Sequence, residues 1–282
     1  MKLLRYHSAS GIRPGLKADD GTLRDLGDYI ADLTGAELGR DTQAKLASLP
    51  LADLPIIRGE PRLAPCVGNV GKFLCIGLNY RDHAEEAELA IPKHPILFLK
   101  ANSAISGPNY PVVLPRGAEK VDWEVELGVV IGKTAKYVGA EDALDHVAGY
   151  CVVNDVSERS FQMDLSGQWT KGKSCDSFGP IGPWLVTPDE VPDPQQLALY
   201  CDVNGKRMQQ GHSGTMIFSV AEIISHLSQL MTLHPGDLIA TGTPPGVGMG
   251  QKPVPVYLKA GDTLRLGIDG LGEQRQHIVE DS

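Results

Sequence analysis

Two glutamates set in an apolar stretch are the residues of this sequence best placed to bind a metal ion. Glu124 and Glu126 alternate with apolar residues through the segment 121–131, and this period of two predicts a strand. Side chains at i and i+2 lie roughly 7 Å apart on one face of a strand. A buried pair of carboxylates needs a cation between them, because unpaired buried charge is too costly. If that face is exposed, the pair is a solvated edge without a function.

Asp155 is a third carboxylate that can belong to the same site. It ends the apolar run 149–155, which predicts a buried strand. It can instead cap a helix that begins near Ser157. Oxygen ligands without histidine or cysteine select hard ions, so the three acids together indicate Mg²⁺ first and Mn²⁺ or Ca²⁺ next.

His83 and Glu86 form a candidate proton-transfer pair. They stand three residues apart in the polar stretch 79–89, so they share a face if that stretch is helical. A carboxylate beside an imidazole orients the ring and raises its basicity, which suits it to take a proton from water. A surface helix with an unrelated histidine explains the same spacing, and the pair alone does not decide between the two.

Lys173 lies in a segment that imitates a nucleotide-binding motif. Residues 167–174 match the pattern GxxxxGKS. No apolar strand precedes the motif, and residues 178–183, which follow it, contain two prolines and cannot form the required helix. We therefore reject nucleotide binding and interpret Lys173 as a loop cation that faces an anionic substrate. Lys171 adds a second cation to which the sequence assigns no role.

The composition is that of an acidic, turn-rich globular protein. The 282 residues carry a formal net charge of −9, which argues against nucleic acid as a partner. The five cysteines are scattered and favour neither disulfides nor a zinc site. No apolar run approaches the length of a membrane span and no signal-peptide pattern follows Met1, so we expect a cytoplasmic protein without a membrane partner.

The elements that must position these residues are mostly short strands, as 32 glycines and 20 prolines favour. Residues 1–65 predict a small α+β domain, with a strand at 2–6, a hairpin turn at 19–22 and helices near 27–34 and 40–48. Residues 70–282 predict a second domain, with strands at 73–77, 96–100, 149–155, 236–243 and 261–266 and a helix after the capping box Ser219–Glu222. The predicted fold class is α+β and mostly β, a mixed β roll or barrel with peripheral helices.

Five motifs in this order resemble the fumarylacetoacetate hydrolase family. They are Asn79-Tyr80-Arg81-Asp82-His83, Glu124-Val125-Glu126-Leu127, Asp155, Lys173-Ser174 and Thr241-Gly242-Thr243-Pro244. The resemblance covers about residues 70–270 and implies a distorted β roll that is usually a homodimer. It implies a mobile lid around the pair His83 and Glu86. It also implies Mg²⁺ or Mn²⁺ held by Glu124, Glu126 and Asp155, and a substrate pocket lined by Arg159, Gln162, Lys173 and Thr243.

The resemblance implies an activity on a small anionic 2-oxo acid. A 2,4-diketo acid would chelate the metal, His83 oriented by Glu86 would activate water, and cleavage of the C3–C4 bond would release pyruvate with Lys173 stabilising its enolate. The N-terminal unit is similar to that of bacterial 2,4-diketo-3-deoxy-L-rhamnonate and L-fuconate hydrolases. Decarboxylation of oxaloacetate, keto–enol isomerisation and ureidoglycolate cleavage use the same kind of centre. A non-catalytic relative and a Mg²⁺-dependent phosphatase are alternatives from other classes.

Overall fold

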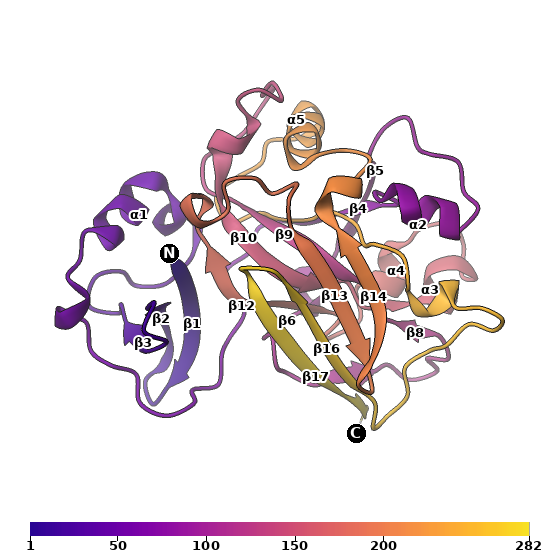
Figure 1. The fold of residues 1–282 in the computed structure, drawn as a ribbon, viewed down its shortest axis with the longest axis horizontal. Coiled ribbons are helices and arrows are strands. Elements are labelled where there is room, and N and C mark those ends of the chain that lie inside the picture. Colours follow the sequence, from indigo (N-terminus) through magenta and orange to yellow (C-terminus); the bar gives the residue numbers. More distant parts are fainter. Residues whose placement is uncertain (282) are drawn as a thin grey trace.

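A ten-stranded sheet organises the molecule and joins strands from distant parts of the chain (Figure 1). The computed structural model describes residues 1–281. Along the sheet the order is β3–β2–β1–β12–β10–β9–β15–β4–β5, and β6 pairs with β12. In that order the strands span Leu23–Asp25, Gly11–Lys17, Lys2–Ser8, Gly179–Val186, Val147–Asn154, Val125–Ile131, Leu238–Ala240, Phe73–Gly77 and Ile96–Lys100, with Ile105–Ser106 for β6.

A five-stranded sheet of order β14–β13–β16–β17–β7 forms the second layer. These strands span Lys206–His212, Ala198–Val203, Thr263–Ile268, Gly272–Glu280 and Val112–Leu114, and a separate pair joins β8 (Val121–Asp122) to β11 (Ser157–Glu158). The helices lie at the periphery (Figure 1): α1 (Arg40–Ala47), α2 (Arg81–Glu86), α3 (Arg159–Met163), α4 (Thr170–Lys173) and α5 (Val220–Leu230). None of the helices within residues 1–281 has the length and apolar composition needed to cross a membrane. The predicted fold class, α+β and mostly β, is confirmed.

Both faces of the ten-stranded sheet are buried, because a different cluster of apolar side chains covers each one. Val129 of β9 points into the cluster shared with the five-stranded sheet, where Leu266 of β16 also lies. Val130, on the opposite face of β9, points into a second cluster that includes residues of the N-terminal unit. The predicted alternation is confirmed, and by the same period Glu124 and Glu126 share the face of Val130.

The strand predicted for this segment is interrupted at residues 123–124, between β8 and β9. Side chains replace a strand ladder there. The Glu124 N–H donates to Asn154 Oδ1 at 3.2 Å, and the Val125 N–H donates to Gln209 Oε1 at 3.0 Å. Because both buried N–H groups have hydrogen-bond partners, the backbone at Glu124 is held in a fixed position.

The helix predicted near 27–34 is wrong. The segment makes a single turn, in which the Ile30 N–H donates to the Leu26 carbonyl at 3.1 Å. The Asp32 carboxylate then accepts two hydrogen bonds from the Arg5 guanidinium, at 2.6 and 2.7 Å. These bonds tie Asp32 to Arg5 of strand β1, and the turn ends there without extending into a helix.

Most other predicted elements are present, with ends that differ by a few residues. The strands expected at 73–77 and 96–100 are β4 and β5, the second expected helix is α1, and the helix expected within 79–89 is the shorter α2. Both hydrogen bonds of the capping box between Ser219 and Glu222 are present at the start of α5.

The N-terminal strands extend the large sheet. Lys2 of β1 pairs with Val186 of β12, and Leu3 pairs with Leu185. Strands β2 and β3 continue outward from β1. The division of the chain into domains 1–65 and 70–282 stays a prediction.

Candidate metal and catalytic site

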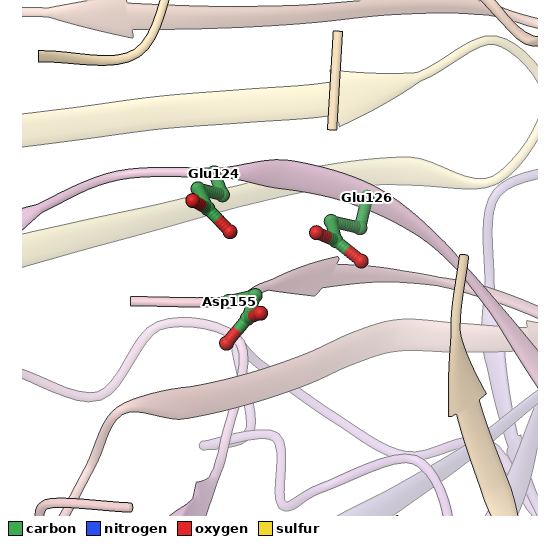
Figure 2. A group of neighbouring side chains, drawn as sticks. All are labelled: Glu124, Glu126 and Asp155. Atoms are coloured by element: carbon green, nitrogen blue, oxygen red, sulfur yellow. The ribbon is translucent and has the colours of Figure 1, made fainter. Parts of the chain in front are cut away.

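Three carboxylates converge where two neighbouring central strands of the ten-stranded sheet, β9 and β10, begin and end. Figure 2 shows Glu124, Glu126 and Asp155 as close neighbours: Glu124 precedes β9, Glu126 belongs to it, and Asp155 follows the end of β10. One oxygen from each lies within 4.8 Å of the others. The exposed fractions are 6%, 2% and 0%, so a solvated edge is excluded. Trp123 and Val125, on the other face, are fully buried in the core.

Two lysines bind the acidic cluster from the same side. Lys173 Nζ donates to Glu124 Oε2 at 2.6 Å and to Asp155 Oδ2 at 2.8 Å. Lys100 Nζ donates to the other Asp155 oxygen at 2.5 Å and to the Val156 carbonyl at 3.0 Å. Lys173 was predicted from the sequence to belong to the site, whereas Lys100 was not. A lysine at the end of an apolar strand was the available signal, since such a residue is rarely buried unless it is paired.

Arg159 joins the cluster to a further carboxylate that the sequence analysis also missed. Its guanidinium donates to Glu124 Oε1 at 2.6 Å, to Asp122 Oδ2 at 2.9 Å and to Gln162 Oε1 at 3.0 Å. Asp122 is completely buried. Arg159 and Gln162 therefore orient Glu124 in this structure, in addition to lining the cavity described below.

The charges of this cluster do not balance. Its four carboxylates face three cationic side chains, namely Asp122, Glu124, Glu126 and Asp155 against Lys100, Arg159 and Lys173.

Glu126 is the carboxylate left without a cationic partner among residues 1–281, because its hydrogen bond comes from the Gly242 N–H at 2.8 Å. Burial and the neighbouring charges of Asp155 and Glu124 raise its pKa well above the ordinary value. Burial acts in the same direction on Glu124, but Lys173 and Arg159 outweigh it and lower the pKa of Glu124 to about 2.

A divalent cation fits this donor set. The three converging carboxylates each offer an oxygen, no histidine or cysteine is among them, and the cluster has an excess of negative charge. These are the features that favour a hard ion such as Mg²⁺ or Mn²⁺. An added cation would relieve the repulsion that raises the pKa of Glu126.

The predicted pair His83 and Glu86 is formed on α2. His83 Nδ1 lies 3.0 Å from Glu86 Oε2, and the Gly246 N–H donates to the same carboxylate at 3.0 and 3.2 Å to its two oxygens. Burial raises the pKa of Glu86, but these two donors outweigh it, so the pKa lies below its ordinary value. Asn79 fixes the start of the helix, since its amide donates to the Thr241 carbonyl at 2.8 Å.

Asp122 connects this pair to the acidic cluster through the glycine loop (residues 242–250). Its Oδ1 accepts the Gly248 N–H at 2.6 Å, and its Oδ2 accepts the Met249 N–H at 3.0 Å. The same loop presents Gly246 to Glu86. Hydrogen bonds therefore link Glu124 through Arg159 and Asp122 to the glycine loop, and the backbone of that loop leads on to Gly246, which bonds to Glu86.

A cavity of about 740 Å³ lies over the cluster and brings the predicted residues together. It is lined by His83, Glu86, Glu124, Glu126, Arg159, Gln162, Lys173 and Thr243, among others. Asp155 lies beneath it, with no exposed surface. The Thr243 hydroxyl donates to the Val125 carbonyl at 2.9 Å, which fixes its place on the wall.

Lys171 points elsewhere. Its Nζ donates to the carbonyls of Ser166 and Gln168, at 3.0 and 2.7 Å, and it does not line the cavity. The rejection of a nucleotide-binding motif is confirmed, because the helix at Lys173 has only four residues and strand β12 follows it.

The fold and the site define a class of mostly β proteins with a buried acidic cluster beneath a cavity and a histidine–carboxylate pair beside it. The family model described as fumarylacetoacetate (FAA) hydrolase C-terminal matches residues 72–279. The chain belongs to the fumarylacetoacetate hydrolase family, whose members are enzymes.

Individual relatives are similar to this chain over nearly the whole length of both proteins. A protein from Burkholderia lata, whose provisional name of hydrolase specifies no substrate, is 58% identical over 277 residues, which cover 98% of each chain. The structure of maleylpyruvate hydrolase from Sphingobium sp. SYK-6, in complex with manganese (II) ion and pyruvate, is 31% identical with a TM-score of 0.83 and covers 100% of both chains. The structure of a 5-carboxymethyl-2-hydroxymuconate delta-isomerase from Mycobacterium smegmatis is 34% identical with a TM-score of 0.78, also over 100% of both chains.

Neutralising Glu124 and Glu126 should change the stability of the metal-free protein in opposite directions. Glu124→Gln removes a negative charge that pairs with the buried Arg159 and Lys173. It should lower the free energy of unfolding by about 3 kcal/mol. Glu126→Gln removes a group whose pKa is raised by folding, and such a group costs stability above its ordinary pKa, so this variant should be more stable than wild type. Urea unfolding in EDTA at neutral pH measures both. Shifts of the same sign would contradict the charge assignment.

Asp122→Asn should weaken the contacts of residue 122 with Arg159 and with the glycine loop. The new amide NH₂ cannot accept hydrogen bonds from the glycine loop or from Arg159, so the free energy of unfolding should fall by about 1–3 kcal/mol. Turnover should fall further than stability explains, because the loop that carries Gly246 to Glu86 is held less firmly at Gly248 and Met249. The control is Asp164→Asn, an exposed carboxylate paired with Lys120, which should change neither quantity. Equal effects of the two variants would contradict this role of Asp122.

Proposed function

We propose that the protein is a Mg²⁺- or Mn²⁺-dependent hydrolase that cleaves the C3–C4 carbon–carbon bond of a 2,4-diketo acid and releases pyruvate and a carboxylic acid. The observation that carries the proposal is the convergence of three buried carboxylates, Glu124, Glu126 and Asp155, at a cavity that His83 and Glu86 also line. The maleylpyruvate hydrolase whose structure is similar to this chain holds manganese and pyruvate, which supports a metal and a pyruvate-forming substrate here.

The metal would be held by Glu124, Glu126 and Asp155. When bound it would supply the positive charge that chelates a 2-oxo acid and draws electrons from the breaking bond. His83 takes a proton from a water molecule as the resulting hydroxide adds to the C4 carbonyl, and Glu86 fixes the orientation of the imidazole. Lys173 places a positive charge where the leaving pyruvate fragment gains negative charge. Collapse of the adduct at C4 to a carboxylic acid breaks the C3–C4 bond and leaves its electron pair on the pyruvate fragment. Transfer of the proton that His83 took from water to C3 then completes pyruvate.

The identity of the acyl group is a separate question from the reaction. The resemblance of the N-terminal unit implies 2,4-diketo-3-deoxy-L-rhamnonate or L-fuconate, from the degradation of sugar acids, as one candidate substrate among the acylpyruvates. The charged end of the cavity recognises only the part that becomes pyruvate, so it supports any acylpyruvate equally. We also expect a homodimer, as the resemblance implies.

Isomerisation of an unsaturated 2-oxo acid is the second candidate. The similar isomerase from Mycobacterium smegmatis favours it. An isomerase moves a proton and needs no activated water, so the two candidates differ in what the base must do. Oxaloacetate decarboxylation and ureidoglycolate cleavage are further reactions that the same charged end can support.

A substrate panel distinguishes these reactions. The metal-stripped protein is incubated with acetylpyruvate, a 2,4-diketo-3-deoxy sugar acid, oxaloacetate, 5-carboxymethyl-2-hydroxymuconate and ureidoglycolate, with and without Mg²⁺ or Mn²⁺. We expect metal-dependent release of pyruvate together with one equivalent of carboxylic acid from an acylpyruvate. Carbon dioxide, urea or an isomer as the main product, with no acylpyruvate cleaved, would replace the hydrolase proposal.

His83→Ala should cut hydrolysis by about 10²–10⁴-fold, since it removes the general base. Metal affinity should remain as in wild type, because His83 contacts none of the three carboxylates of the cluster. Steady-state rates and metal titration of the same preparation provide both values. Near-normal hydrolysis would show that another group takes the proton.

Lys173→Met should abolish turnover, because it removes the cation that both Glu124 and Asp155 accept from. Lys171→Met is the matched control, since this lysine lies two residues away and bonds only to its own loop. Rates of pyruvate release for the two variants make the comparison. Loss of activity in both would mean that the short helix α4 matters as a whole rather than Lys173 itself.

A further inference from the structure

The cavity has two chemically different parts. The charged part is lined by Glu124, Glu126, Arg159 and Lys173. The wall that continues from it carries Ile96, Phe98 and Trp169. The rings of Phe98 and Trp169 meet edge to face, with centroids 5.4 Å apart. A ligand anchored by its carboxylate at the charged part therefore extends along an apolar wall.

Large apolar side chains from three separate segments are exposed where this wall reaches the mouth of the cavity. Leu89 follows α2, Met163 ends α3, and Met249 belongs to the glycine loop. Their exposed fractions are 56%, 53% and 42%. Apolar residues that gather around one opening typically mark a surface that a ligand covers. Here they face the end of a ligand that lies away from the charged part.

The apolar part of the cavity offers few partners for hydroxyl groups. Apart from the residues of the charged part and the His83–Glu86 pair, the polar side chains that line the cavity within residues 1–281 are Gln162, Thr243, Glu88, Lys252 and the indole of Trp169. Gln162 already bonds to Arg159 of the charged part, and the Thr243 hydroxyl already donates to the Val125 carbonyl. Burying a hydroxyl without a hydrogen-bond partner costs free energy, whereas each buried methylene improves binding.

We propose that the acyl group of the substrate is an apolar group of several carbons, in place of the short hydroxylated acyl group of a deoxy sugar acid. This inference rests on the proposed function, because it places a 2-oxo acid at the charged part. It assigns Met163, Met249 and Leu89 to binding of the acyl chain. The chemistry at C4 is unchanged by it.

Binding of plain 2-oxo acids tests the inference without turnover. Pyruvate, 2-oxohexanoate and 2-oxooctanoate are titrated calorimetrically into the protein in the presence of Mn²⁺. We expect the affinity to rise by roughly fourfold for each methylene that becomes buried. A 2-oxo acid with hydroxyls along the same chain should bind more weakly than its alkyl counterpart. A flat series, or tighter binding of the hydroxylated compound, would overturn the inference.

A matched pair of variants locates the effect. Met163→Ser should reduce the affinity for 2-oxooctanoate by about tenfold while leaving pyruvate binding unchanged, since it exchanges an apolar contact for a polar one. Leu165→Ser is the control, because Leu165 is 58% exposed but does not line the cavity. Equal losses in the two variants would contradict the assignment of Met163.

The outcomes separate this inference from the proposed function. If pyruvate itself does not bind in the presence of Mn²⁺, the proposed 2-oxo acid site is wrong and the inference falls with it. If pyruvate binds and chain length has no effect, the proposed function stands and only the apolar acyl group is refuted.

Discussion

The cost of burying an unequal number of positive and negative charges is the constraint on which this structure depends. Four carboxylates and three cationic side chains meet where β9 begins and β10 ends. Each cation is shared between acceptors, so loss of one partner leaves others unpaired. Glu126 is the member of the cluster without a cationic partner in the described part of the chain, so its charged form is disfavoured, and its pKa is raised by burial and by Asp155 and Glu124. Such a cluster persists in a fold only if it is stabilised elsewhere or completed by a cation.

The surrounding elements hold this cluster in place and connect it to the base. Interruption of the strand between β8 and β9 frees the backbone of Glu124 and Val125 to bond to Asn154 and Gln209. Asp122 then ties Arg159 to the glycine loop. Because Gly246 of this loop bonds to Glu86, the orientation of the His83–Glu86 pair depends on the contacts that Asp122 makes with the loop. The candidate metal site and the His83–Glu86 pair are therefore joined through the glycine loop.

Local patterns predicted much of this arrangement, while pairings between distant residues escaped them. The period of two located Glu124 and Glu126 on one face, and the three-residue spacing brought His83 to Glu86. Lys100 was missed because its partner Asp155 lies 55 residues away and nothing in the strand itself reveals it. Asp122 was missed for the same reason, since its hydrogen-bond partners Arg159 and Gly248 lie 37 and 126 residues away in the sequence. The predicted helix near 27–34 failed because the contact of Asp32 with Arg5 is invisible to helical periodicity.

Calorimetric titration of the metal-stripped protein with Mn²⁺, followed by oxalate, tests the central claim most directly. Oxalate imitates the enolate of pyruvate, so it binds where a carboxylate and an adjacent oxygen chelate the metal. The account predicts one Mn²⁺ per chain and oxalate binding that is at least tenfold tighter with metal than without it. Failure to bind Mn²⁺, or an oxalate affinity that does not change when Mn²⁺ is present, would contradict the claim that the buried carboxylates form a single metal site for a 2-oxo acid.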